Sequence, residues 1–162
     1  MNLLDLNITE GKDEQWPYFP YINFFISRND GQREFVGEIF YNNPWEWTIK
    51  IIRLHTANLV KNTLIDPQRF WEIPSKKYPW LWIACLSRFI QEIKTGTNSK
   101  KITLVSVPDA IWFYRKAAKR LLVNWIIVDW KEWRWESWLS KMPVWVVKYF
   151  WDVSDYVFEF TL

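Results

Sequence analysis

Three consecutive β-strands are predicted between residues 21 and 55, which read YINFFISRNDGQREFVGEIFYNNPWEWTIKIIRLH. Aromatic and β-branched side chains fill each run, as is typical of strands. Turn-forming residues separate the runs, Asn-Asp-Gly at 29–31 and Asn-Asn-Pro at 42–44. Because short turns join antiparallel neighbours, the segment predicts a three-stranded meander. Its strands are expected at 21–27, 34–41 and 47–55.

Two helices and three further strands are predicted after this meander. Residues 80–95 carry apolar side chains at helical spacing, which predicts a long helix capped by Gly96. The apolar run 101–107 predicts a strand, and 109–122 a second helix with Asp109 at its N-cap. Two more strands are expected, at 125–130 and 156–162.

The order of these elements predicts an α+β fold. A strand, a helix and another strand in succession favour a crossover and one parallel pair in an otherwise antiparallel sheet. We therefore expect a mixed, mainly antiparallel sheet with helices packed on it. A single domain is expected over residues 1–162, with residues 1–20 as an arm that its aromatic side chains hold on the body at 21–162.

The composition is that of a globular chain with an aromatic interior. Of 162 residues, 49% are hydrophobic and 20% aromatic, and fourteen are tryptophan. Disordered chains lack such aromatic content, and a disulfide scaffold needs more than one cysteine, so both classes are excluded. The four glycines are too scattered to build a Walker-type loop or a dinucleotide-binding turn. One cysteine and one histidine cannot form a Cys/His metal cluster.

Charge and hydropathy predict a cytoplasmic protein. The formal net charge is +3, too small to imply a nucleic-acid partner by itself. Residues 1–5 lack the basic start of a secretory signal, and no window of about 18 uncharged apolar residues predicts a membrane span. A lone cysteine, Cys85, fits a reducing compartment. We therefore expect a cytoplasmic chain without a membrane partner.

Cys85 and His55 would form a nucleophile–base pair if the fold brought them together. Cys85 lies in the apolar helical run 81–86, where a thiol usually serves as a small hydrophobic side chain. His55 ends the third predicted strand, and strand ends border pockets, so it is a candidate site residue. Its alternative is a structural or surface histidine. Glu38 and Glu46 are expected on a solvated face or in a turn.

The second predicted helix carries the most informative motif, in the stretch VPDAIWFYRKAA at residues 107–118. It resembles a late helix of the GNAT-type N-acetyltransferases, in which a strand is followed by Ala-x-x-Phe-Tyr-x-Lys. The matching residues are Ala110, Phe113, Tyr114 and Lys116. The order of predicted elements over residues 21–162 is similar to that family as well. The resemblance therefore implies a GNAT-like topology.

The resemblance also implies roles for individual residues. Tyr114 would lie near the thioester of acetyl-CoA and protonate the departing thiolate as a general acid. Its alternative is a core aromatic on the apolar stripe of the helix. Lys116, on the cationic side of the helix, and His55 are the candidate cofactor-binding residues.

Two departures from the family pattern concern the cofactor. The family holds the pyrophosphate of acetyl-CoA on backbone amides of a glycine-containing loop before the long helix. Residues 55–64 contain no glycine here, and Ala118-Lys119 stand where Gly-Phe usually follows the helix motif. We therefore expect the binding of acetyl-CoA to be weak or absent.

Two other functions compete with an acyltransferase-like domain. Residues 130–151 contain six of the fourteen tryptophans, which cannot all point one way, so part of their surface is expected to bind a protein partner or a second copy. The cationic helix face, with tryptophans and basic residues alternating at 130–135, would suit a nucleic acid. Glu132 and Glu136 interrupt that charge. We therefore rank acyl-CoA-type transfer or binding first, protein interaction second and nucleic-acid binding third.

Overall fold

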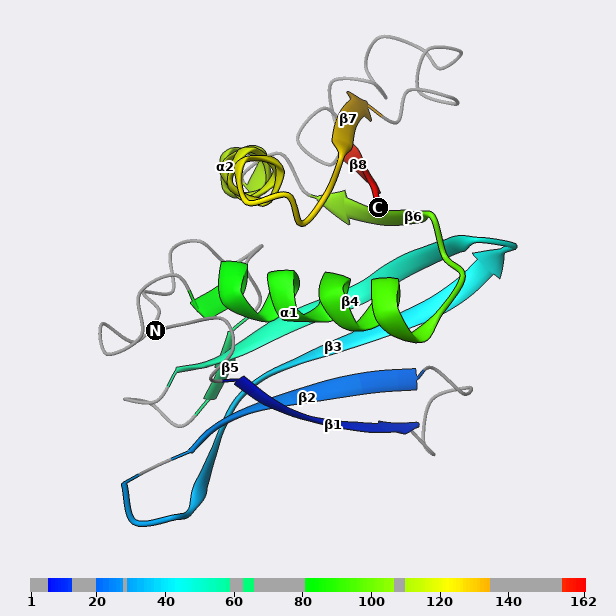
Figure 1. The fold of residues 1–162 in the computed structure, drawn as a ribbon. Coiled ribbons are helices and arrows are strands. Elements are labelled where there is room, and N and C mark those ends of the chain that lie inside the picture. The colour runs from blue at the N-terminus through cyan, green and yellow to red at the C-terminus, as the bar shows by residue number, and fades with distance from the viewer. Residues whose placement is uncertain are drawn as a thin grey trace, which may run out of the picture.

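The computed structural model describes residues 6–12, 20–27, 29–58, 63–65, 81–106, 110–134 and 156–162 (Figure 1). These residues form an α+β fold with a mixed, mostly antiparallel sheet and two helices, as the sequence predicted. The strands are β1 (Leu6–Lys12), β2 (Pro20–Ser27), β3 (Arg33–Trp45), β4 (Thr48–Asn58), β5 (Thr63–Ile65), β6 (Lys101–Ser106), β7 (Asp129–Arg134) and β8 (Tyr156–Thr161). The helices are α1 (Leu81–Gly96) and α2 (Ile111–Val123). The described strands lie in the order β1-β2-β3-β4-β6-β8-β7, and β5 pairs with β4 beside this path.

Strands β2, β3 and β4 form the predicted antiparallel meander. Gly31 has a φ of +80° in the first turn, a conformation that glycine adopts without a steric penalty. The backbone N–H of Gln32 donates to the Asp30 carboxylate at 3.0 Å. The second connection differs from the prediction, because β3 continues through Pro44 and the turn falls at residues 46–47. A register irregularity after Asn42 accommodates the proline.

Residues 6–12, within the segment 1–20 that is predicted as an arm, form an edge strand. Strand β1 pairs antiparallel with β2 along its whole length, from Leu6 opposite Ile26 to Lys12 opposite Pro20. An edge strand needs few apolar side chains, and Ile8 supplies one that packs against the core. The aromatic residues 16–19, on which the arm prediction depended, lie outside the described part of the chain.

A bulge changes which side chains of β4 face the core. Strict alternation predicted Ile49, Ile51 and Arg53 on one face. In the structure Ile51 pairs with Tyr41 and Arg53 with Phe40, so Ile52 is an extra residue in β4. A bulge of this kind shifts the alternation by one residue. As a result Ile49, Ile51 and Leu54 are buried, while Ile52 and Arg53 are exposed.

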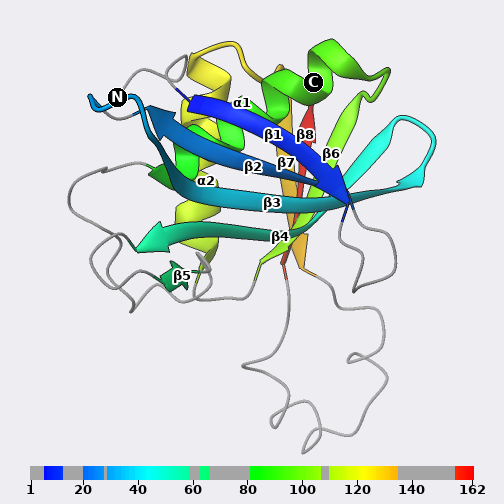
Figure 2. The ribbon, with the colours of Figure 1, turned by 90° about the horizontal axis from the view of Figure 1, so that it is seen from below.

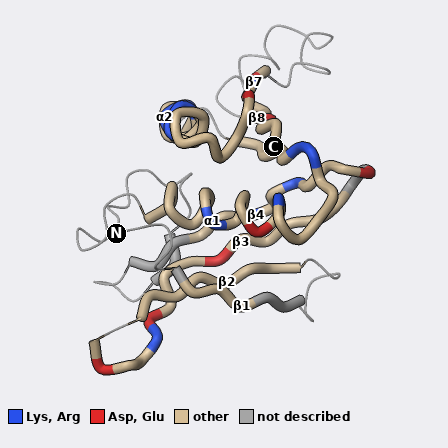
Figure 3. The backbone as a smooth tube through the Cα atoms, in the orientation of Figure 1, with Lys and Arg blue, Asp and Glu red and all other residues tan. Residues whose placement is uncertain are grey.

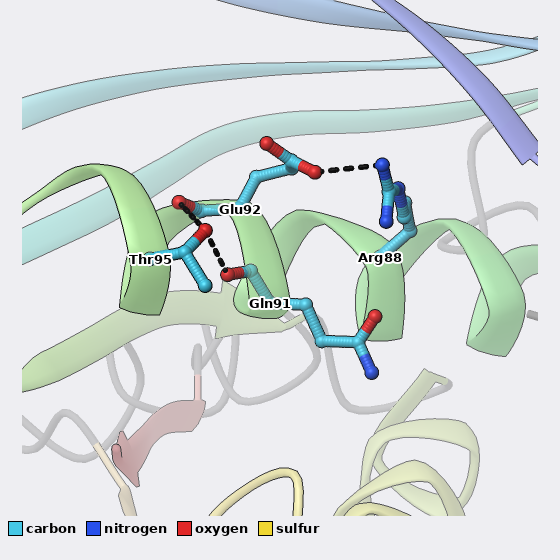
Figure 4. A network of polar contacts seen from close by, with 4 residues as sticks. All are labelled: Arg88, Gln91, Glu92 and Thr95. Carbon is cyan, nitrogen blue, oxygen red and sulfur yellow. Dashed lines mark hydrogen bonds and ion pairs between the residues drawn. The ribbon is translucent and has the colours of Figure 1, made fainter. Parts of the chain in front are cut away.

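Helix α1, which was predicted at residues 80–95, covers strands β3 and β4. Its Phe89 is fully buried and contacts the ring of Tyr41 edge-on, with 5.2 Å between centroids. Its last turns carry polar contacts, an Arg88–Glu92 ion pair at 2.8 Å and hydrogen bonds from Thr95 (Figure 4). Gly96 has no positive φ, so it is not the glycine cap that was predicted. Instead Thr97 donates its N–H and its hydroxyl to the carbonyl of Ile93, at 3.1 and 2.8 Å.

Helix α2 lies on the same face of the sheet as α1, which Figure 2 shows behind strands β1 to β4. The two helices touch through Trp82 and Phe113, with 5.3 Å between ring centroids. Strand β6 pairs in parallel with β4, as the crossover predicted. The strand predicted at 125–130 begins four residues later, at Asp129, because residues 124–128 form the turn that ends α2. Asp109, the expected N-cap, lies outside the described residues, and Ala110 precedes the first helical turn.

The hydrophobic core lies between the sheet and both helices. Its largest fully buried side chains come from both halves of the chain: Phe24, Phe89, Phe158, Phe160, Ile22, Ile39, Leu86, Ile90, Ile102, Leu121 and Ile127. Neither described helix is both long enough and apolar enough to cross a membrane. The core therefore belongs to a layered fold in which one sheet face carries α1 and α2.

Candidate functional site

Strands β4 and β6 pair over three residues only, 48–50 with 101–103. Beyond this point β6 continues along β8, and β4 continues along β3. At residues 56–58, β5 takes the place of β6 as the neighbour of β4. Between these two contacts lie residues 51–55, where β3 is the only described strand that pairs with β4. We call residues 51–54, which precede His55, the β4 open edge.

An open strand edge is a chemical feature because its backbone amides and carbonyls need hydrogen-bond partners. Figure 1 shows β4 and β6 running apart from the end at which they pair. The edge lies beneath α1 in the middle of the sheet, rather than at the outer strands β1 and β7. A ligand with its own amide groups could therefore pair with β4 as a short strand would.

Tyr114 lies on the helix side of this opening and is almost completely buried. Its ring contacts Phe113 at 5.0 Å and Phe158 at 5.5 Å between centroids. Phe158 pairs with Leu104, the first residue of β6 beyond the parallel contact with β4. Tyr114 is therefore a core aromatic near the point at which β4 and β6 separate.

The three predicted site residues do not meet at one point. Lys116 is exposed on the outer side of α2, since two residues along a helix turn the side chain by about 200° from Tyr114. His55 lies on the other face of the sheet, because its neighbour Leu54 points into the core beneath α1. Tyr114 and His55 thus flank the sheet from opposite sides, while Lys116 faces solvent.

A polar row crosses three strands on the face turned away from the helices. Asn23 of β2 lies opposite Glu38 of β3, which lies opposite His55 of β4. The His55 Nδ1 is 3.1 Å from the Glu38 Oε1, and the two side chains are only 17% and 18% exposed. The Oδ1 of Asn23 is buried and accepts no hydrogen bond. We call these three residues the polar row.

The surroundings of the polar row are aromatic. One neighbouring pair is Tyr21 and Phe40, at 5.5 Å between ring centroids, and the other is Phe25 and Phe35, at 5.7 Å. A carboxylate on one ring nitrogen fixes the tautomer and the orientation of a histidine ring. The row therefore has the chemistry of a proton-transfer or hydrogen-bonding site. The sequence predicted Glu38 on a solvated face or in a turn, whereas in the fold this side chain is mostly covered and paired with His55.

Cys85 takes no part in either feature. It is fully buried in α1, and this burial raises the pKa of its thiol well above the usual range. It lies on the helix side of the sheet, whereas His55 points to the other side and contacts Glu38. The Cys85–His55 pair considered from the sequence is therefore not formed, and Cys85 acts as a small core side chain.

The cationic side of α2 and the first tryptophans of 130–151 lie at the surface near β7. Arg115 donates from Nε to both carboxylate oxygens of Glu132, at 2.8 and 2.9 Å, and this hydrogen bond raises the pKa of Arg115. Trp130 is half-buried and stacks on Phe158, whereas Trp133 is 39% exposed. The other four tryptophans of that segment lie outside the described residues.

Comparison with known proteins assigns no family. No protein-family model, no curated protein and no solved structure matches the chain. The residues that the structure describes also contain no group of three or more His, Cys, Asp or Glu side chains that could hold a metal ion. The β4 open edge and the polar row are therefore the features from which a function can be argued.

Proposed function

We propose that the chain is a divergent GNAT-like domain that binds an acyl-CoA-type ligand at the β4 open edge. The observation that carries the proposal is the short parallel contact, which leaves residues 51–54 bounded by β6 at one end and β5 at the other. The element order supports it, because β2-β3-β4-α1-β6-α2-β7-β8 agrees with the order of the family that the sequence resembles. Strand β8 also lies between β6 and β7.

The chemistry of the ligand fits a strand edge. The pantetheine arm of an acyl-CoA contains two amide groups in an extended chain, so it can exchange hydrogen bonds with a strand as a peptide does. The open edge spans about 13 Å, at roughly 3.3 Å per strand residue. An arm bound there would carry its thioester along the seam between β4 and β6, with Tyr114 on the helix side.

The chain offers fewer binding contacts to the nucleotide end of the ligand than to the pantetheine arm. Residues 56–58 and 63–65, where the resembled family would place part of its phosphate-binding loop, are paired strands instead. They contain no glycine that would let backbone amides approach a pyrophosphate closely. Lys116 contributes at most a charge from the outer side of α2. We therefore infer weak binding that depends mainly on the pantetheine arm.

If acyl transfer occurs, its proton transfers fall to groups on the two faces of the sheet. Tyr114 is the candidate general acid for the departing thiolate, as the resemblance implies. The His55–Glu38 pair directly follows the open edge in β4 and lies on the other face, where it would accept the proton of an incoming nucleophile. A domain that only binds the ligand would need the open edge and neither of these groups.

Calorimetric titration with three ligands tests the proposal. S-acetyl pantetheine and acetyl-CoA should bind with dissociation constants that agree within about threefold, because both carry the amide arm. Adenosine 3′,5′-bisphosphate, which lacks that arm, should not bind. Binding of acetyl-CoA and the nucleotide without S-acetyl pantetheine, or no binding of any of the three, would contradict the proposal.

The role of Tyr114 needs a separate variant. Tyr114→Phe keeps the ring in the core and removes only the hydroxyl, so it should lower the rate of acetyl transfer more than it weakens binding. Tyr156→Phe is the matched control, because Tyr156 is a partly buried tyrosine of β8 rather than of α2. An equal rate in Tyr114→Phe and wild type would leave Tyr114 as a core residue only.

Protein interaction is the second candidate function. Trp133 is 39% exposed near the end of β7, on the face turned away from α2, with the Lys131 ammonium 5.7 Å from its ring centroid. Exposed aromatic side chains often anchor protein contacts. If the segment 130–151 forms such a contact, Trp133→Ala should shift sedimentation toward a smaller species. An identical sedimentation profile for wild type and variant would count against it.

A further inference from the structure

Helix α2 ends in a turn that normally contains a glycine. The N–H of Ile126 donates to the carbonyl of Leu121 at 2.9 Å, and the N–H of Trp125 donates to that of Leu122 at 3.1 Å. These two bonds define a Schellman motif, in which the residue after the C-cap adopts a left-handed conformation. That residue is Trp125, with a φ of +58°. A side chain at this position is strained relative to glycine, so its presence calls for a reason outside helix termination.

The side chain of Trp125 projects into solvent together with three apolar neighbours. Trp125 is 84% exposed, Val123 76% and Val128 59%, and Leu122 is exposed as well. We call these four residues the α2 tip. None of the described residues makes a ring or cation–π contact with Trp125. The Schellman motif does not need the α2 tip for its apolar contacts, because Leu121 and Ile126 are buried beneath the tip.

Trp47 is a second tryptophan with a positive φ, and it makes contacts within the fold. Its φ is +62°, in the turn between β3 and β4. Its carbonyl accepts hydrogen bonds from the N–H groups of Lys100 and Lys101, at 2.7 and 3.1 Å. The ammonium of Lys100 lies 5.0 Å from the centroid of its ring. Trp47 thus joins the β3–β4 turn to the start of β6, whereas Trp125 joins nothing in the described fold.

The charge on α2 next to the tip is positive. Residues 110–128 contain four cationic side chains and no acidic one, and the exposed Asp129 at the start of β7 is the acidic residue that follows them. All four are exposed on α2, where Figure 3 shows the Lys and Arg positions in blue. Lys119 and Arg120 precede Leu122 of the tip by less than one helical turn. A partner that meets the tip therefore also meets positive charge, so charge complementarity selects an anionic surface.

We propose that the α2 tip inserts into the interfacial region of an anionic lipid membrane. The most exposed side chain of the tip is a tryptophan, the residue that favours the boundary between headgroups and acyl chains. Lipids reshape around a protruding side chain, whereas a protein partner would need a matching pocket. The cations one turn behind the tip lie where anionic headgroups would surround it. The sequence predicted no membrane partner because it contains no spanning segment, and a peripheral contact of this kind needs none.

Vesicle co-sedimentation of the full chain tests the proposal. Wild type should bind vesicles of phosphatidylcholine with phosphatidylserine, bind pure phosphatidylcholine far less, and lose affinity as salt is added. Trp125→Gly should weaken that binding by about tenfold or more, because the largest inserting side chain is gone. The thermal midpoint of unfolding of Trp125→Gly should equal or exceed that of wild type, because glycine relieves the strained φ. Trp47→Gly is the matched control, because it removes a half-exposed tryptophan at a similar positive φ outside the α2 tip, and it should leave vesicle binding unchanged.

The other outcomes each overturn the proposal. Absence of wild-type binding to anionic vesicles would do so, and so would equal binding by wild type and folded Trp125→Gly. Sedimentation of wild type as a dimer that Trp125→Gly converts to a monomer, without vesicle binding, would assign the tip to a second copy instead. Lys119→Glu separates charge from insertion, since it should weaken binding to anionic vesicles only.

Discussion

Strand β4 has two edges that differ in how they are held. Its edge toward β3 is paired from Thr48 to Thr56, with bulges but without a long gap. Its edge toward β6 is paired over three residues and then separates. Backbone hydrogen bonds therefore hold strands β1 to β4 together as one unit. Strands β6, β8 and β7 form a second unit, which is attached to the first by a short strand pairing and by side-chain packing.

Helix α1 supplies much of that packing. Phe89 contacts Tyr41 of β3, and Trp82 contacts Phe113 of α2. Because Tyr114 of α2 packs on Phe158 of β8, α1 joins the two units through α2. Lys94 also donates from its ammonium to the carbonyl of Ile126 after α2, at 3.1 Å. We therefore expect substitutions in the core of α1 to lower the free energy of unfolding more than substitutions at the polar contacts of either unit.

The largest effect is expected from Phe89→Ala. Phe89 is fully buried between α1 and the sheet, and removing such a ring lowers the free energy of unfolding by about 3–5 kcal/mol. Ile52→Ala, at the exposed bulge of β4, is the control and should cost less than about 1 kcal/mol. Urea denaturation measures both. A Phe89→Ala loss no larger than that of Ile52→Ala would refute the role given to α1.

Cys85 gives a pH-dependent test of the same helix. Its thiol has a raised pKa in the folded chain because it is buried, while in the unfolded chain it ionises near the ordinary value of about 8.5. Above that pH the unfolded state alone loses the proton, so the free energy of unfolding falls as pH rises. Between about pH 9 and 10.5 the fall should be about 2 kcal/mol larger in wild type than in Cys85→Ala. Parallel curves for the two proteins would mean that Cys85 is accessible to water.

The polar row should show a smaller, pairwise effect. A double-mutant cycle with Glu38→Gln and His55→Gln should give a coupling energy of about 1 kcal/mol, because the pair is mostly covered. The Lys101–Glu159 pair, at 3.4 Å with an exposed lysine, is the control and should couple more weakly. Equal coupling in the two cycles would show that the polar row is no more protected than a surface contact.

The smallest effect is expected where α2 meets β7. Arg115 and Glu132 form a close ion pair, but the arginine is half exposed, so Arg115→Gln should lower the free energy of unfolding by no more than about 0.5 kcal/mol. The loss should shrink further in high salt. A loss above about 1 kcal/mol would mean that this ion pair, and not core packing alone, holds α2 on the sheet.

The sequence predicted the parts of the fold in which local pattern and local structure agree. Alternating residues and the Asn-Asp-Gly turn predicted the β2–β3 hairpin, and helical spacing predicted α1 within one residue at each end. Prediction was wrong at the start of β7, because a tryptophan stands where the helix-ending turn usually has glycine. It did not mark strand β1 within the arm expected at 1–20, because a polar edge strand forms only when β2 lies beside it.

The candidate site was harder to predict because it depends on register. Asn23, Glu38 and His55 form a row only when three strands are aligned, and bulges at Val36 and Ile52 shift that alignment in ways that no local motif signals. The β4 open edge depends on where pairing with β6 stops, which the sequence does not mark. The motif around Tyr114 did predict a helix with an inward-facing tyrosine. Its role as a general acid stays a prediction.

Residue-resolved amide hydrogen exchange with and without S-acetyl pantetheine tests the β4 open edge most directly. In the free chain, the amides of residues 51–54 that point away from β3 should exchange faster than the amides of residues 48–50 that pair with β6. Adding the ligand should slow exchange at residues 51–54 and leave β1 and β2 unchanged. Uniform protection along β4 in the free chain, or no slowing at residues 51–54 under ligand saturation, would contradict the account.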